Sequence, residues 1–335
     1  MLLPIDFGSY RARGDKVTAM KRLVAIVLVG LVVGGMGCAT QSRKLPPVGA
    51  EAVSLLGHPL FAPALEAEVL VKREADRAAA ARAAVQQPDS EQALIWLGRR
   101  TAYLGRFQES VAIYTEGLER FQNSARLLRH RGHRWITLRE FERAVTDFEA
   151  AKAAIAGTAD EIEPDGIPNP SGIPTSTLHS NIHYHLALAH YLRGDFAVAA
   201  QAHADGAHLN TTPERMVSAG YWHALALLRA GRRSDATTVL APITADFKVE
   251  ENGAYHQLCL ALQGHSDPEA LWAAVRSQDS GNDRPTIGYG VAVMRLLRGD
   301  SAGATALLTE VVQSGPWAAF GAIAAEADLA RGLTR

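Results

Sequence analysis

One pattern of small and aromatic residues occurs twice in this chain, 34 residues apart, and it constrains the fold more than any other feature. The first copy is Leu94, Leu97, Gly98, Gly105, Phe107, Ser110, Tyr114 and Gly117, and the second is Leu128, Arg131, Gly132, Arg139, Phe141, Ala144, Phe148 and Ala151. A period of this length is typical of a helix-turn-helix unit, which buries its apolar face only by stacking on neighbouring units. The pattern therefore predicts a helical solenoid.

The composition agrees with an all-α fold. Of the 335 residues, 47% are hydrophobic and 21% are charged, and the formal net charge is -1. This balance lacks the basic excess that nucleic-acid binding usually needs, so we expect no nucleic-acid partner. Alternation typical of strands is scarce, and runs such as residues 64–85 consist of good helix formers.

A short apolar stretch near the N-terminus has the pattern of an export signal. Lys21 and Arg22 precede an apolar run over residues 23–33, and small residues lead from there to Cys38. As a helix, the run spans only about 16 Å, too short for a hydrocarbon layer of roughly 30 Å. Residues 1–37 are therefore predicted to be a cleavable signal peptide rather than an anchor helix.

The Met-Gly-Cys ending at Cys38 resembles the lipobox of bacterial lipoproteins, in which the cysteine becomes the lipidated first residue of the mature chain. The resemblance implies a stable lipid anchor on Cys38. Residues 1–19 precede the signal, and we expect Met20 to be the true start. Ala39 stands where an aspartate would favour inner-membrane retention, which implies an outer-membrane location facing the periplasm. The alternative is a plain secretory signal with an incidental cysteine.

The repeat copies themselves point to a known family. Residues 94–107 match the motif LxxLGxxxxxxGxF, and Tyr114 follows. The chain here resembles the tetratricopeptide repeat (TPR) family, and as a whole it is similar to uncharacterised bacterial TPR lipoproteins. The resemblance implies a right-handed solenoid of antiparallel helix pairs, with Gly98 and Gly132 at close helix crossings. The second copy departs from the family where Arg139 replaces the turn glycine.

Four regions follow the signal peptide. We expect a lipidated linker over residues 38–63, and a leading helix with the clear repeats over 64–157. An acidic, proline-rich loop follows over 158–177, and degenerate repeats with a closing helix occupy 178–335.

The second repeat carries a candidate binding groove. In TPR proteins the second, fifth and ninth positions of the first helix line the concave face, and the resemblance places Arg126, Arg129 and His133 there. Arg99 matches His133 one repeat earlier, and Tyr103 supplies an apolar contact. Guanidinium groups in a groove hold carboxylates through paired hydrogen bonds. The alternative is a solvated basic face.

The loop over residues 158–177 is unusually long for this architecture. It carries four acidic residues, Asp160, Glu161, Glu163 and Asp165, and four prolines stiffen it. Three interpretations stay open: a solvated spacer, an ordered loop over the concave surface, or a loop that docks on the basic groove until a partner displaces it.

Histidines cluster in the third repeat. His179 and His183 are four residues apart on one helical face, a spacing that can hold a metal ion. No HExxH motif accompanies them, and packing histidines are the alternative. Phosphate-loop, nucleophile-elbow, CxxC and dinucleotide motifs are missing. We therefore predict neither an enzyme nor a cofactor.

These features together predict a membrane-tethered periplasmic scaffold that binds a protein or peptide partner in its concave groove. By analogy with other repeat lipoproteins, the partner would be a cell-wall enzyme or an envelope assembly factor. Two alternatives remain: a metal-dependent hydrolase built on His179 and His183, and an architectural subunit of an envelope complex with an apolar convex face.

Overall fold

The computed structural model describes residues 46–278 and 281–333. The chain divides into a unit of residues 1–43 and a unit of residues 44–335, and the features below belong to the second unit. The predicted signal peptide and Cys38 lie outside the described residues.

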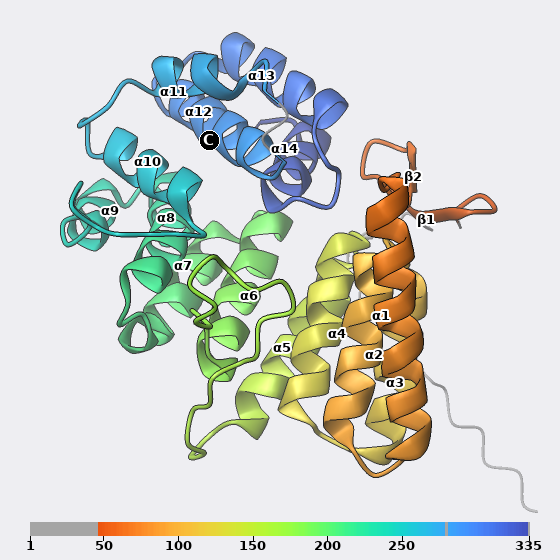
Figure 1. The fold of residues 1–335 in the computed structure, drawn as a ribbon. Helices are drawn as coiled ribbons and strands as arrows, with labels where there is room; N and C mark the ends of the chain where they lie inside the picture. Colours follow the sequence, from red (N-terminus) through yellow and green to blue (C-terminus); the bar gives the residue numbers. More distant parts are fainter. Residues whose placement is uncertain (1–45, 279–280, 334–335) are drawn as a thin grey trace, which may run out of the picture. The chain divides into compact units, whose positions relative to one another are not determined.

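Helices dominate the described part of the chain (Figure 1). The elements are β1 (Ala50–Val53), β2 (Pro59–Phe61), α1 (Ala67–Gln86), α2 (Glu91–Tyr103), α3 (Phe107–Arg120), α4 (Ala125–Thr137), α5 (Phe141–Ala154), α6 (Leu178–Arg193), α7 (Phe196–Asp205), the 3-10 helix η1 (Ala207–Leu209), α8 (Pro213–Arg229), α9 (Arg233–Leu240), α10 (Gly253–Leu262), α11 (Pro268–Val275), α12 (Asp283–Leu297), α13 (Ser301–Ser314) and α14 (Phe320–Arg331). Successive helices pack in pairs, which confirms the prediction of an all-α solenoid of the TPR type.

The repeated glycines lie where two helices of a pair cross. A Cβ atom on Gly98 of α2 would lie 2.3 Å from the Tyr114 ring of α3, and one on Gly132 of α4 would lie 2.8 Å from the Phe148 ring of α5. Both rings are buried. The repeated small and aromatic positions are therefore a packing device, as the sequence predicts.

The turn between the two helices of a pair needs a left-handed residue. Gly105 meets this need with a φ of +79°, and Arg139 takes the same conformation with a φ of +66°. A side chain in this region costs roughly 1–2 kcal/mol. The departure from glycine noted in the sequence therefore carries a cost, which the contacts of Arg139 offset.

Arg139 ties the second repeat to the C-terminal helix. Its guanidinium is fully buried and pairs with Glu326 of α14, with Nη2 and Oε2 2.8 Å apart. Glu326 Oε1 also accepts a hydrogen bond of 2.6 Å from the backbone N–H of Leu55. Glu326 therefore joins the N-terminal hairpin, the α4–α5 turn and α14.

The C-terminal helix contacts an earlier repeat as well as its own neighbours. α14 packs against α12 and α13, which precede it in the chain, and also against α6 of the third repeat. Its first residue, Phe320, lies against the rings of His133 and His185, at centroid distances of 5.4 and 5.7 Å. Apolar contact with the second and third repeats explains why α14 returns to them.

Residues 50–61 form a hairpin within the region expected to be a linker. Strand β1 pairs antiparallel with β2. Ala52 is buried against Phe107, and the side chain of Gln108 donates a hydrogen bond of 2.6 Å to the carbonyl of Glu51. The hairpin is thus packed on α3 rather than extended.

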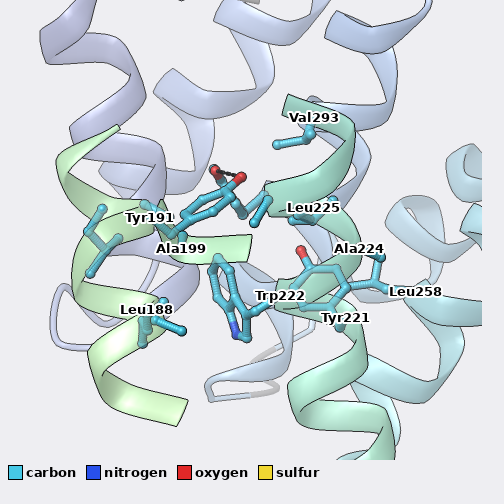
Figure 2. Close-up of a cluster of buried hydrophobic side chains, with 14 of the residues drawn as sticks. Leu188, Tyr191, Ala199, Tyr221, Trp222, Ala224, Leu225, Leu258 and Val293 are labelled. Atoms are coloured by element: carbon cyan, nitrogen blue, oxygen red, sulfur yellow. Dashed lines mark hydrogen bonds between the residues drawn. The ribbon is translucent and has the colours of Figure 1, made fainter. Parts of the chain in front are cut away.

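The later repeats share one large core (Figure 2). Trp222 of α8 is fully buried and stacks on Tyr289 of α12, and the hydroxyls of Tyr191 and Tyr289 are 2.7 Å apart. Cys259 is also buried there. In the described part of the chain, no helix has both the length and the apolar character needed to cross a membrane.

Candidate functional site

The candidate site lies on the first helices of the first two repeats. Ser124 caps α4 by accepting a hydrogen bond from the N–H of Leu127, which fixes where the helix begins. Arg126, Arg129 and His130 then follow at helical spacings of three and four, so all three side chains emerge on one face. The acidic loop between α5 and α6 (Figure 1, yellow-green) contacts this face through Glu161 and Glu163.

Arg126 binds Glu161 of the loop. Both its Nε and its Nη2 donate to the Glu161 carboxylate, and its Nη1 lies 3.2 Å from Glu91. Hydrogen bonding to Glu161 raises the pKa of Arg126. The side chains of Arg126 and Glu161 are 43% and 39% exposed, so water weakens the pair, and such pairs contribute about 0–1 kcal/mol.

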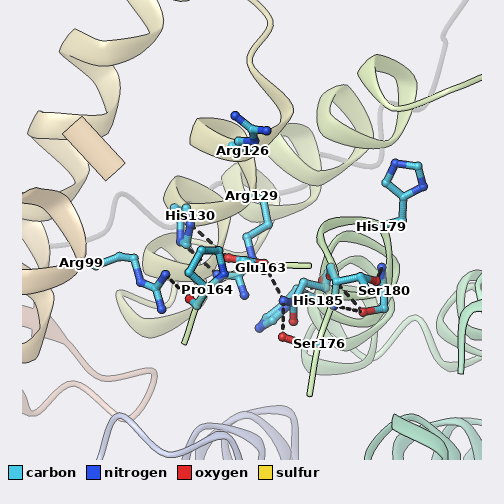
Figure 3. Close-up of polar contacts among 12 residues, drawn as sticks. Arg99, Arg126, Arg129, His130, Glu163, Pro164, Ser176, His179, Ser180 and His185 are labelled. Carbon is cyan, nitrogen blue, oxygen red and sulfur yellow. Dashed lines mark hydrogen bonds and ion pairs between the residues drawn. The ribbon is translucent and has the colours of Figure 1, made fainter. Parts of the chain in front are cut away.

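Glu163 is the buried centre of the site (Figure 3). Its carboxylate lies 3.1 Å from Arg129 Nε and 3.1 Å from His130 Nε2, and the Asn181 amide donates to it at 2.6 Å. Burial opposes the charged carboxylate, but Arg129, His130 and Asn181 together hold the pKa of Glu163 well below its usual value. Glu163 is therefore a buried anion paired with the Arg129 cation.

His130 has a defined role in this cluster. Burial, followed by the nearby Arg129 charge, lowers its pKa to about 4, so the imidazole is neutral near pH 7. Arg129 Nη1 lies 3.0 Å from His130 Nδ1, which assigns Nδ1 as the acceptor and leaves the Nε2 proton facing Glu163. The neutral imidazole therefore connects the arginine and the carboxylate.

Two more arginines hold the loop through its backbone. Arg99 Nη1 donates to the carbonyl of Pro164 at 2.6 Å, and Arg100 Nη1 donates to the carbonyl of Gly166 at 3.2 Å. Gly166 approaches α2 so closely that a Cβ atom there would lie 1.6 Å from the hydroxyl of Tyr103. A side chain at residue 166 would therefore force Tyr103 or the loop to shift.

The loop is also fixed at its base, where its two ends meet, and near its middle. Near α6, Asp160 accepts a hydrogen bond from the N–H of His179 at 3.0 Å, and Ile162 forms an antiparallel bridge with Thr177. At the far side, Asn169 donates to Glu251 at 2.7 Å. The loop therefore reaches from α2 and α4 to the segment that precedes α10.

Polar groups make the loop contacts, and its large apolar side chains stay in water. Ile162, Ile167 and Ile173 are each about two-thirds exposed. The Asp165 carboxylate differs from those of Glu161 and Glu163. Its Oδ2 atom has no hydrogen-bond partner among the described residues. Burial raises the pKa of Asp165. A cavity of about 190 Å³ remains between the loop and α2, lined by Gln92, Ile95 and Arg99 among others.

The predicted groove residues are therefore covered by the chain itself. Arg99, Tyr103, Arg126 and Arg129 contact the loop, whereas His133 packs against His185 and Phe320. Arg100 and His130 also belong to the site, and the sequence analysis does not predict them. Each of them lies one residue beyond a predicted arginine, and the four-residue spacing of His130 from Arg126 was the available signal.

The predicted metal candidates stand apart from this cluster. His179 Nε2 is 3.2 Å from the hydroxyl of Thr158, and burial, followed by Lys152, lowers the pKa of His183. Within residues 46–278 and 281–333, no group of three or more His, Cys, Asp or Glu side chains is arranged to hold a metal ion.

No protein-family model and no curated protein matches this chain. Among solved structures, it is similar to YrrB, "a TPR protein with an unusual peptide-binding site", at 13% identity and a TM-score of 0.40, over 70% of this chain and 91% of that one. It is also similar to a structure of Naa15/Naa10 bound to HypK-THB, at 13% identity and a TM-score of 0.34, over 73% of this chain. The chain spans about a third of that second protein, with 36% covered.

The stacked helix pairs, with a glycine opposite an aromatic ring at the crossings of the first two pairs, define the class of this protein. It is a TPR-like helical-repeat protein. Its distinguishing feature is a basic groove on α2 and α4 that its own acidic loop covers.

Proposed function

We propose that this chain is a protein-interaction scaffold that binds an extended segment of a partner protein on α2 and α4. One observation carries the proposal: the arginines of this face hold an extended stretch of polypeptide by two carboxylates and two backbone carbonyls. A surface that recognises both side chains and backbone in this way is suited to a peptide ligand. Nothing in this arrangement requires a chemical step.

A photo-crosslinking amino acid at Gln92 tests this function. Gln92 is the second residue of α2, the position equivalent to Arg126 in α4, and it lines the cavity beside the loop. We expect crosslinking in native membranes to join a protein partner to position 92. The matched control is Glu116, which is exposed on α3 of the same repeat and should give no such product. Crosslinks that form at position 116 and not at position 92 would contradict a groove-bound partner.

We also propose that a lipid on Cys38 tethers the scaffold to the periplasmic face of the outer membrane. The support is the Met-Gly-Cys sequence that follows the apolar stretch. A tether raises the local concentration of the scaffold near envelope partners, such as cell-wall enzymes or assembly factors, without adding contacts.

Replacing Cys38 with alanine is expected to move the protein from the membrane fraction to the soluble fraction. The lipid has no other attachment point in the predicted mature chain, because the second cysteine, Cys259, is buried in the core. Fractionation with immunoblotting measures the effect, and Cys259→Ala is the matched control that should stay in the membrane fraction. Retention of the Cys38→Ala protein there would exclude this anchor.

An architectural role is a second candidate, favoured by α1. This helix contains no buried residue, and Val71 and Val85 are 70% and 81% exposed. Apolar side chains exposed on one helix are suited to contact with another subunit.

A further inference from the structure

We propose that residues 161–166 of the loop are an internal ligand, which a partner segment with the same recognition pattern displaces. This inference rests on the proposed function, because it names the chemistry of the partner that α2 and α4 would bind. The pattern is two carboxylates separated by one residue, with a glycine three residues after the second carboxylate.

The spacing of the carboxylates matches the spacing of the cations. In an extended chain, residues 161 and 163 point to the same side and lie roughly 6.5–7 Å apart. On α4, residues three apart such as Arg126 and Arg129 lie about 5–6 Å apart at Cβ. Ile162, between the two glutamates, is exposed. The groove therefore recognises the two carboxylates and does not select the residue between them.

The preference for glycine comes from α2. Arg99 and Arg100 bind backbone carbonyls, which every peptide offers, so they add affinity without selecting a sequence. Tyr103 selects, because its hydroxyl occupies the space that a side chain at residue 166 would need. A partner segment with a glycine at this position therefore fits against Tyr103 without displacing it, as the loop does.

The buried Arg129 explains why the loop is exchanged rather than simply released. Leaving a buried charge without its partner is strongly unfavourable, so an empty groove is costly. A second carboxylate removes this cost, whereas a neutral peptide does not. The loop is therefore displaced by acidic segments and not by neutral ones.

The loop is also a ligand that a partner can outcompete. Its Glu161 pair is half exposed, and none of its three isoleucines is buried. Its advantage is covalent attachment, which makes its binding intramolecular. A partner that adds apolar contacts to the same polar pattern gains affinity that the loop lacks.

Binding of a synthetic peptide to the full chain tests the inference. The probe is a labelled peptide of residues 160–167, and the protein variant is Gly166→Ala, which keeps every charge but places a Cβ atom against Tyr103. We expect the variant to bind the probe at least tenfold more tightly than the unsubstituted chain. A second variant, E161Q/E163Q, should show the same gain, with thermal unfolding checked for both. The control peptide has both glutamates changed to glutamine and should not bind.

Hydrogen exchange of the unsubstituted chain supplies the second measurement. At saturating probe, the amides of residues 161–163, 165 and 166 should exchange faster, because the loop has left the groove. Equal affinity of the variants and the unsubstituted chain would overturn the inference, as would binding of the glutamine peptide or binding without faster exchange. Crosslinking at Gln92 is independent of these results, so a partner captured there with a failed peptide test would leave the scaffold function standing.

Discussion

Replacing Glu326 with alanine is expected to lower the free energy of unfolding by about 3–5 kcal/mol, because it leaves the buried Arg139 guanidinium without its counter-charge. The same substitution removes the acceptor for the N–H of Leu55. Urea denaturation measures the loss, and the midpoint should fall.

An exposed pair provides the comparison for this substitution. Lys152 and Asp205 are 3.1 Å apart, with side chains 32% and 38% exposed, so Asp205→Ala should cost about 1 kcal/mol or less. Adding Arg139→Met to Glu326→Ala should recover part of the loss, since both buried charges are then gone. If Glu326→Ala costs no more than Asp205→Ala, the pair does not hold α14 in place.

Acidification from pH 7.5 to 5 is expected to destabilise the fold by about 2 kcal/mol for each of two buried histidines. Burial, followed by Arg129, lowers the pKa of His130 to about 4 and that of His185 to about 3. In the unfolded chain both keep the ordinary value near 6.5, so the unfolded state binds protons first as pH falls. The stability is complete above pH 6.5 and is lost progressively below it.

A pH series of thermal unfolding checks this expectation, and His185→Phe isolates one of the two groups. His185 stacks on Phe148 and lies edge-to-face with Phe320, so a phenyl ring suits these surroundings and does not titrate. The variant should lose less stability over this range than the unsubstituted chain. His58→Gln, at an exposed position, is the control for substitution itself. Glu163 contributes to the pH dependence only at lower pH. Because its pKa is lowered in the folded state, the stability that it provides is present above its ordinary pKa of 4.5 and is lost as the pH falls below that value. An unchanged profile for His185→Phe would exclude His185 as a titrating group.

The repeating part of the fold was predictable because local packing repeats in the sequence. The same helix crossing occurs in two successive repeats, between Gly98 and Tyr114 and between Gly132 and Phe148. The structure confirms both crossings. The return of α14 was not predictable in this way. Its contacts join Arg139 to a residue 187 positions away, and no period encodes such a distance. The only local signal was an arginine at a turn that favours glycine.

The sequence predicted most residues of the candidate site, but not that the loop covers the arginines. The repeat positions pointed to Arg126 and Arg129, and the loop composition pointed to Glu161 and Glu163. That these four meet depends on the path of the loop, which the bridge between Ile162 and Thr177 and the far contact of Asn169 determine. Such three-dimensional constraints leave no pattern along the chain.

The contacts of Glu326 also fix how many repeats this protein can have. In a linear array each unit touches only its neighbours, so units are gained or lost with little effect on the rest. Here one carboxylate must reach Leu55 and Arg139 at once, from a helix that follows all the other repeats. Inserting or deleting a helix pair between Arg139 and Glu326 would move the carboxylate out of reach. The Arg139–Glu326 ion pair therefore fixes the number of helix pairs between these two residues.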